Sequence, residues 1–491
     1  MPPRARPAPL LVALGAAALA FPAGASAHTV DIEYRFPLPV WLYALAGGVA
    51  VLASAPAAAL GLRRERDWTS RDLYPLVRRL RLGRVGLVLT SALFLVSVAG
   101  GLFGSDLFFE NPATIVFVVD FWVGLGLVSI LVGNVWDFVN PLSALGRALE
   151  RRLAARGVRA RPYPEWLGVW PSIGFLLAWT WIELVWTNSG PRTLALLALG
   201  YVVWQLAAMA AFGTEVWLER GELFTVVART FARFAPLELY VVEPAGPCRA
   251  RRLCEGERRG CASCWLDADP ARRRVRLRPF GAGVRREASL LAGGGTLVLA
   301  LLATVVYDGF ARTERYLNLE AFFLLRSDWL GFHDRFLTTL IMLAIVAAFA
   351  LAFLGVVALV GRAEREGTSA TARRYAPTLI PIAAVYFVSH YFVYLIFVGQ
   401  FTPAVVLDPF EQEWIPDYGV WTGIPGSAVW YAQVGLIVFG HVVSVFEAHR
   451  VSRRPHAGAR AALAAQTPLL LLMVAYTASG LWVLGQALRA P

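Results

Sequence analysis

About ten apolar segments, each long enough to cross a lipid bilayer, run through this sequence of 491 residues. A membrane-spanning helix needs about 20 predominantly apolar residues. Hydrophobic residues make up 57% of the chain and charged residues only 16%. We therefore predict an all-α integral membrane protein in contact with the lipid bilayer. The expected spans lie near 38–62, 85–104, 113–135, 167–187, 193–214, 288–307, 335–360, 376–401, 428–447 and 462–487.

The first 27 residues have the features of a secretory signal peptide. Arg4 and Arg6 precede a short apolar run at 10–21, and Ala-Ser-Ala follows at 25–27. Cleavage after residue 27 would leave His28 as an exported N-terminus. The alternative is that this segment stays attached as an additional helix.

The distribution of arginine predicts the orientation of the spans. All 46 basic residues are arginine, and 37 of them fall in the loops that lie on the cytoplasmic side if residue 28 is exported. Such an excess is typical of cytoplasmic loops in membrane proteins. We therefore expect a multi-pass protein of the cell membrane with both mature termini exported. The formal charge of +12 then reflects topology, and we expect no nucleic-acid partner.

One sizeable polar segment, 215–287, separates membrane segments 28–214 and 288–491. We expect it to form a small cytoplasmic insert. Apolar and basic residues at helical spacing in 221–235 predict an amphipathic helix along the inner membrane surface. Alternating residues at 237–242 and 275–278 predict two strands, which would form a β-ribbon.

The insert contains all four cysteines of the chain, Cys248, Cys254, Cys261 and Cys264. The two-residue spacing of the last pair is typical of metal ligands, because one turn brings both sulfurs to one ion. In a reducing cytoplasm such a cluster favours zinc over disulfides. We expect a structural zinc ion; an iron–sulfur centre, redox thiols or free thiols are the alternatives.

Four ionisable residues fall inside predicted spans: Asp120, Glu183, His390 and His441. Such groups are costly in hydrocarbon, and they commonly mark ligand sites or proton relays. Together they predict an intramembrane site in which the histidines bind a transition metal and the carboxylates act as base or further ligands. A proton relay or a solvated ligand pocket is equally consistent with these residue types. The alternative is that each group is hydrogen-bonded locally between packed helices.

Several short motifs make the chain resemble an actinobacterial and archaeal membrane family labelled fenitrothion hydrolase. They are RPYPEWLG (161–168), WTWIEL (179–184), PRTLA (191–195), SHYF (389–392), GQ (399–400), WYAQ (430–433), GH (440–441) and AH (448–449). The resemblance implies hydrolysis of an aryl phosphotriester, in which water attacks phosphorus and a nitrophenolate leaves. That chemistry normally uses metal-bound hydroxide.

Three classes of function follow from these features. The first is a membrane-embedded, metal-dependent hydrolase acting on a small hydrophobic substrate, as the resemblance implies. The second is a transporter or channel for a metal ion, a proton or a small solute, with the same intramembrane residues as a relay. The third is a membrane subunit or assembly factor of a redox complex, with the cysteine cluster as its contact.

Overall fold

The chain folds into an almost entirely helical bundle, which confirms the predicted fold class. A computed structural model describes residues 38–61, 72–79, 82–186, 190–242, 262–286, 290–326, 334–412, 414, 421, 423–452 and 459–487. The expected signal peptide, His28 and three of the four cysteines lie outside these residues.

Ten helical segments among the described residues are long and apolar enough to cross a membrane. They confirm the ten predicted spans. Nine contain the helices α2 (Val40–Gly61), α4 (Leu82–Phe103), α9 (Trp170–Leu184), α10 (Pro191–Phe212), α15 (Gly294–Ala311), α17 (Asp334–Glu364), α19 (Ile380–Val398), α21 (Gly426–Ser452) and α22 (Ala459–Ala487). The third span joins α5 (Pro112–Thr114), the π-helix η2 (Ile115–Gly124) and α6 (Leu125–Leu131).

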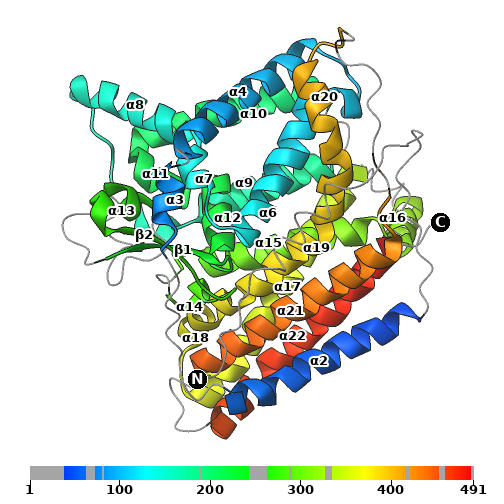
Figure 1. Ribbon diagram of the computed structural model, residues 1–491. Helices are drawn as coiled ribbons and strands as arrows, with labels where there is room; N and C mark the ends of the chain where they lie inside the picture. Colours follow the sequence, from blue (N-terminus) through cyan, green and yellow to red (C-terminus); the bar gives the residue numbers. More distant parts are fainter. Residues whose placement is uncertain are drawn as a thin grey trace, which may run out of the picture.

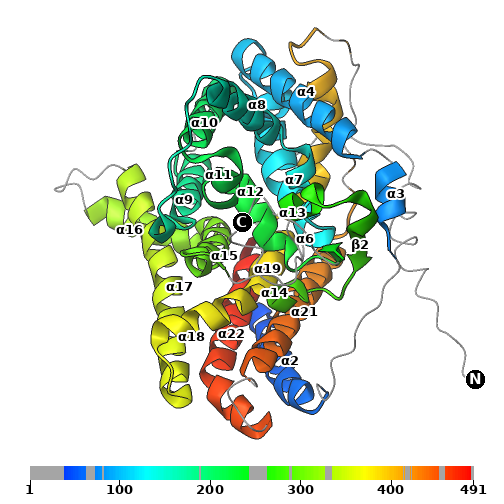
Figure 2. The same ribbon diagram turned by 90° about the vertical axis from the view of Figure 1, so that its left-hand side faces the viewer.

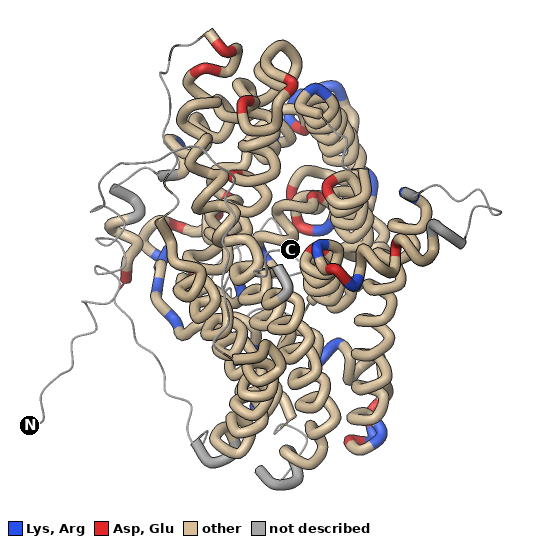
Figure 3. Tube along the Cα trace, turned by 90° about the vertical axis from the view of Figure 1, so that its right-hand side faces the viewer, with Lys and Arg blue, Asp and Glu red and all other residues tan. Residues whose placement is uncertain are grey.

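The spans form two groups that meet at α15 and α19 (Figure 1). One group contains α2, α17, α21 and α22, and the other contains α4, α9, α10 and the third span (Figures 1 and 2). Long stretches of these helices carry no charged residue (Figure 3). Exposed leucines and valines cover the outer faces of α4 and α17, where lipid would contact the protein.

The central helix α15 begins later than the sequence suggested. Gly293 has a left-handed backbone (φ 80°) that ends the preceding turn, so the helix starts at Gly294. A Cβ at Gly295 would lie 2.9 Å from Ala376 Cβ, which shows close packing at this end. The glycines therefore begin the span instead of interrupting it. The expected end at residue 307 was wrong, and α15 continues to Ala311.

The predicted β-ribbon is present. Strands β1 (Leu237–Val241) and β2 (Arg273–Leu277) pair antiparallel, with Leu237 opposite Leu277. We call the end of the bundle that carries these strands the ribbon end. The opposite end, which carries α16 (Glu314–Arg326) and α20 (Thr402–Leu407), is called the α16 end (Figure 1).

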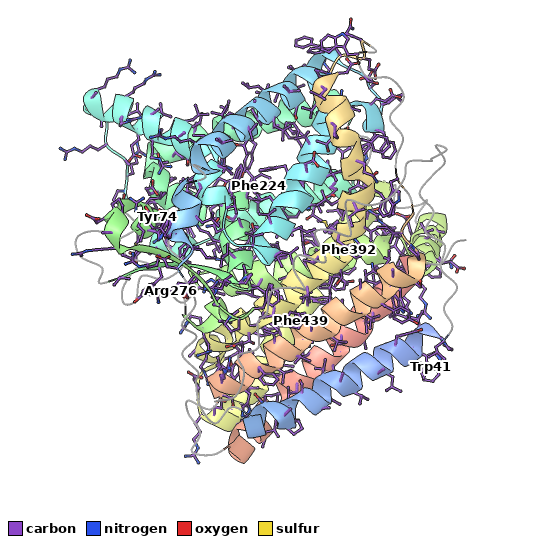
Figure 4. All side chains as sticks on the ribbon, in the orientation of Figure 1. Trp41, Tyr74, Phe224, Arg276, Phe392 and Phe439 are labelled. Carbon is purple, nitrogen blue, oxygen red and sulfur yellow. The ribbon has the colours of Figure 1, made fainter. Side chains whose placement is uncertain are left out.

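The predicted amphipathic helix is also present, but its expected place on the membrane surface was wrong. Helix α12 (Leu223–Ala232) follows α11 (Thr214–Arg220) and packs against α6, α9 and α19. Nine of its ten residues are buried. Phe224 lies inside the bundle (Figure 4), with its ring centroid 4.5 Å from that of Phe121 and 5.5 Å from that of Tyr201. Its polar residue Arg229 binds Asp137 at 3.0 Å, so protein groups replace the headgroups.

The remaining short helices connect these elements. They are α3 (Tyr74–Arg79), η1 (Phe108–Glu110), α7 (Trp136–Val139), α8 (Pro141–Ala155), η3 (Glu165–Leu167), α13 (Ala262–Asp267), η4 (Pro270–Arg272), α14 (Gly283–Arg286), α18 (Thr368–Tyr375), η6 (Ala376–Leu379) and η7 (Gly399–Phe401).

Candidate functional site

A buried carboxylate, Asp308, is the centre of the polar site near the α16 end. It lies in the last turn of α15 and is 1% exposed. Its Oδ2 lies 2.8 Å from His390 Nε2 and accepts a hydrogen bond of 2.9 Å from the Tyr391 hydroxyl. Its Oδ1 accepts from the Arg312 guanidinium, at 3.1 Å from Nη2. Both carboxylate oxygens therefore have partners, as a buried charge requires.

Helix packing determines how these side chains meet. His390 and Tyr391 are neighbours on α19, and Arg312 follows Asp308 by one helical turn. The imidazole stands at 86° to the Tyr391 ring, with centroids 4.6 Å apart. The imidazole also neighbours Gly309, where a Cβ would lie 3.4 Å from His390 Cε1 but only 2.5 Å from Val483 Cγ1 of α22. The glycine at this position thus allows α22 to pack closely against α15 beside the imidazole.

Two further charged groups, Glu183 and Arg312, lie close to the Asp308–His390 pair. Glu183, at the end of α9, is partly buried and interacts electrostatically with both Asp308 and Arg312. Arg312 is 62% exposed at its side chain, whereas Asp308 is buried. The Asp308 carboxylate raises the pKa of the Arg312 guanidinium above its usual value. The site thus contains two carboxylates, one guanidinium and one imidazole, and Arg312 connects it to the α16 end.

The structure does not bring His441 to this site. The carbonyl of Ser389 accepts from Gln433, and the carbonyl of Thr378 accepts from Ser444, so α19 and α21 run antiparallel. In that register His441 lies opposite residue 381, about 13 Å along the helix from His390. His441 instead donates from Nδ1 to the carbonyl of Ile437, one turn back on its own helix, at 2.8 Å.

Asp120 also lies apart from the buried pair. It is on the π-helix η2 and accepts a hydrogen bond of 2.7 Å from the Thr402 hydroxyl of α20. A Cβ at Gly399 would lie 3.7 Å from Asp120 Oδ1, so this carboxyl faces the end of α19. π-Helices are uncommon overall and are enriched at functional sites, but the Asp120 carboxylate makes one hydrogen bond here, with Thr402.

The donor sets found here do not fit a bound metal ion. No group of three histidine, cysteine, aspartate or glutamate side chains with metal-binding geometry occurs in the described part of the chain. His390 Nε2 faces Asp308 and His441 Nδ1 faces a backbone carbonyl, so neither nitrogen is directed at a shared ion.

The cysteine cluster is only partly within the described residues. Cys264, in α13, is 2% exposed and disulfide-bonded. A disulfide sulfur offers no thiolate to a metal ion. Cys264 is therefore not available as the predicted zinc ligand, and the other three predicted ligands, Cys248, Cys254 and Cys261, lie outside the described residues.

Sequence reasoning identified His390 and Glu183 but missed Asp308, Tyr391 and Arg312. Asp308 and Arg312 were expected in an exported loop at 308–335, because the span was expected to end at residue 307. The signal that would have found Asp308 is the glycine triplet at 293–295. Moving the helix start to that triplet places Asp308 inside the helix.

The comparisons with known proteins found no relative. No protein-family model matches the sequence, and searches of curated proteins and of solved structures found no match.

Proposed function

We propose that this polytopic membrane protein translocates protons and that the Asp308–His390 pair binds the transferred proton. The observation that carries the proposal is a carboxylate, 1% exposed in a membrane-spanning helix, that contacts an imidazole at 2.8 Å. Ionisable groups within a membrane are costly, and aspartate, glutamate and histidine chains form the proton relays of pumps and transporters. Imidazole is the side chain that most readily exchanges protons near neutral pH.

The charges around the pair support reversible proton binding. Arg312 offsets part of the negative charge on Asp308, and Glu183 provides a second carboxyl nearby. A proton that arrives at the pair changes the charge balance of a cluster held between α9, α15 and α19. The exposed side chain of Arg312 gives the cluster a polar connection to the α16 end, which is the exported end in the expected topology.

We favour transport over the phosphotriester hydrolysis that the family resemblance implies. Hydrolysis of that kind normally requires a metal-bound hydroxide held by several ligands. Within the described residues, His390 and His441 lie on different parts of α19 and α21 and do not share a site. Release of nitrophenol from an aryl phosphotriester by the purified protein, lost in His390→Gln, would favour the hydrolase instead.

Proton flux into proteoliposomes tests the proposal. Vesicles containing a pH-sensitive dye receive a potassium diffusion potential through valinomycin. We expect proton uptake about tenfold faster than in protein-free vesicles, equivalent to about 1.4 kcal/mol in barrier height. Asp308→Asn and His390→Gln should reduce the rate to that of protein-free vesicles.

Asp120→Asn is the matched control, because it removes another intramembrane carboxylate that does not contact His390. It should keep the rate of the unmodified protein. A protein that conducts no faster than empty vesicles, under either sign of the potential, would overturn the proposal.

A further inference from the structure

Helix α21 carries a row of buried polar side chains that the proton-binding pair does not use. Gln433, His441, Ser444 and Glu447 are 5%, 1%, 0% and 2% exposed. Their spacings of eight, three and three residues place them on one face of the helix. The row extends from the level of His390 toward the ribbon end. Polar groups in a row inside a membrane protein require partners.

Several of these groups have hydrogen-bonding capacity that the protein does not satisfy. Because His441 Nδ1 donates to the carbonyl of Ile437, its buried Nε2 carries a lone pair, and no described residue donates to it. Gln433 donates to the carbonyl of Ser389 at 3.0 Å, yet its own buried Oε1 accepts from no described group. Buried polar atoms are nearly always hydrogen-bonded, and ordered water is the usual partner when protein groups are not.

The row adjoins the proton-binding pair at one end. Gln433 binds the carbonyl of Ser389, the residue directly before His390. Tyr386, one turn along α19, has its ring nearly parallel to the imidazole, with centroids 6.5 Å apart. The Tyr386 hydroxyl is buried and also has no partner among the residues described.

At the other end the row reaches charged residues. The Ser444 hydroxyl bonds to the carbonyl of Thr378 and lies 3.8 Å from the sulfur of Met473 on α22. Glu447, one turn further, binds Arg285 at 2.9 Å and Arg450. The polar groups therefore continue from the pair to ion pairs at the ribbon end.

We infer that ordered water along this row carries protons between the Asp308–His390 pair and Glu447. This inference rests on the proposed proton translocation. His441 Nε2 takes a proton from one water, which forms an imidazolium, and returns it from the same nitrogen to the next water. The Nδ1–H bond to Ile437 is kept throughout, so one proton moves and no other bond changes. His441 is thus a relay group.

Substitutions in the row test the route in the flux assay described above. His441→Leu and Gln433→Leu should each lower proton uptake about tenfold, as Asp308→Asn does. Gln205→Leu is the matched control, because Gln205 on α10 is likewise buried, at 0% exposed, and accepts a hydrogen bond from the Trp217 indole. It should keep the rate. If Asp308→Asn abolishes uptake while both row variants conduct normally, the route is overturned and the proton-binding pair stands.

The water itself is tested in the unmodified protein by X-ray radiolysis, which generates hydroxyl radicals from bound water. Met473 on α22 lies beside Ser444 of the row, whereas Met209 on α10 is not in contact with the row, and both methionines are 0% exposed. We expect oxidation of Met473 to be about tenfold faster than that of Met209, since only Met473 adjoins the proposed water. Equal rates would overturn the inference, whatever the flux of the row variants. This readout needs no proton transport, so it separates failure of the row from failure of the proposed function.

Discussion

Asp308 Oδ2 lies 2.8 Å from His390 Nε2, although 82 residues separate the two along the chain. The same oxygen accepts from the Tyr391 hydroxyl at 2.9 Å. Two donors from one helix thus meet one carboxylate oxygen from another. This arrangement joins α15 and α19, the two helices at which both groups of spans meet.

A double-mutant cycle measures the coupling between these two residues. Asp308→Asn and His390→Gln should each cost about 3 kcal/mol, because each leaves a buried partner uncompensated. The double variant should cost less than the sum by at least about 1 kcal/mol. Denaturant unfolding in detergent gives the free energies. Asp120→Asn combined with His390→Gln is the control and should be additive; additivity in the Asp308 cycle would show that the contact stabilises nothing.

The buried glutamate at the start of α12 should matter for stability. Glu222 is 0% exposed and accepts from the Tyr201 hydroxyl at 2.6 Å and from the backbone N–H of Thr225 at 2.7 Å. Glu222→Ala removes a charged cap inside the bundle and should cost about 2–4 kcal/mol. Tyr201→Phe removes one donor and should cost about 1–2 kcal/mol. Thermal unfolding in detergent compares the stability of the two variants. Equally small losses of stability for Glu222→Ala and Tyr201→Phe would contradict this role of Glu222.

Arg278 should hold the ribbon against the end of α12. Its buried guanidinium donates to the carbonyls of Ala232 and Ala235 at 2.8 and 3.0 Å. Lysine lacks the planar guanidinium with several donors, so Arg278→Lys should not keep both hydrogen bonds to these carbonyls. We expect faster limited proteolysis within 237–277.

Arg276→Lys is the control for Arg278→Lys, because Arg276 lies on the ribbon (Figure 4) over the ring of Tyr240, a contact that lysine can also make. Its cleavage should match that of the unmodified protein. Equal cleavage of both variants would argue against a role for Arg278 in docking.

Glu219 on α11 should make stability depend on pH. Burial, opposed by Arg229 and Arg220, raises the pKa of its carboxyl from 4.5 to about 7. The folded state holds the proton more tightly than the unfolded state, so stability is greatest below pH 4.5 and falls as pH rises toward about 7. Glu219→Gln should remove this loss and stabilise the protein by about 1–3 kcal/mol at pH 8.

Melting temperatures of the Glu219→Gln variant and the unmodified protein, measured from pH 4.5 to 8.5, test this. The difference in melting temperature between the two proteins should increase as the pH rises from 4.5 to about 7. Glu110→Gln, at an exposed carboxylate, is the control and should give a constant difference. A pH-independent difference for Glu219→Gln would contradict the assignment.

The membrane spans were predictable because hydropathy is a local property. All ten apolar segments form helices, and the alternating residues predicted at 237–242 and 275–278 fall in or next to the paired strands at 237–241 and 273–277. The predictions from sequence failed where the local residue pattern and the tertiary environment of a segment disagree. Helix α12 has the amphipathic pattern of a surface helix, but its polar residues find protein partners such as Asp137, so the whole helix is buried. The π-helix around Asp120 has no local signal that we could identify.

The sequence by itself determined that this chain crosses a membrane about ten times and carries costly polar groups within it. It also singled out His390 and His441, since each lies in an apolar segment. Only the tertiary structure decided that His390 pairs with Asp308 and that His441 binds its own helix. The physical reason is that the length and hydropathy of a membrane-spanning segment depend only on the residues of that segment. The meeting of two side chains depends instead on the rotation and register of neighbouring helices, which close packing at positions such as Gly309 determines.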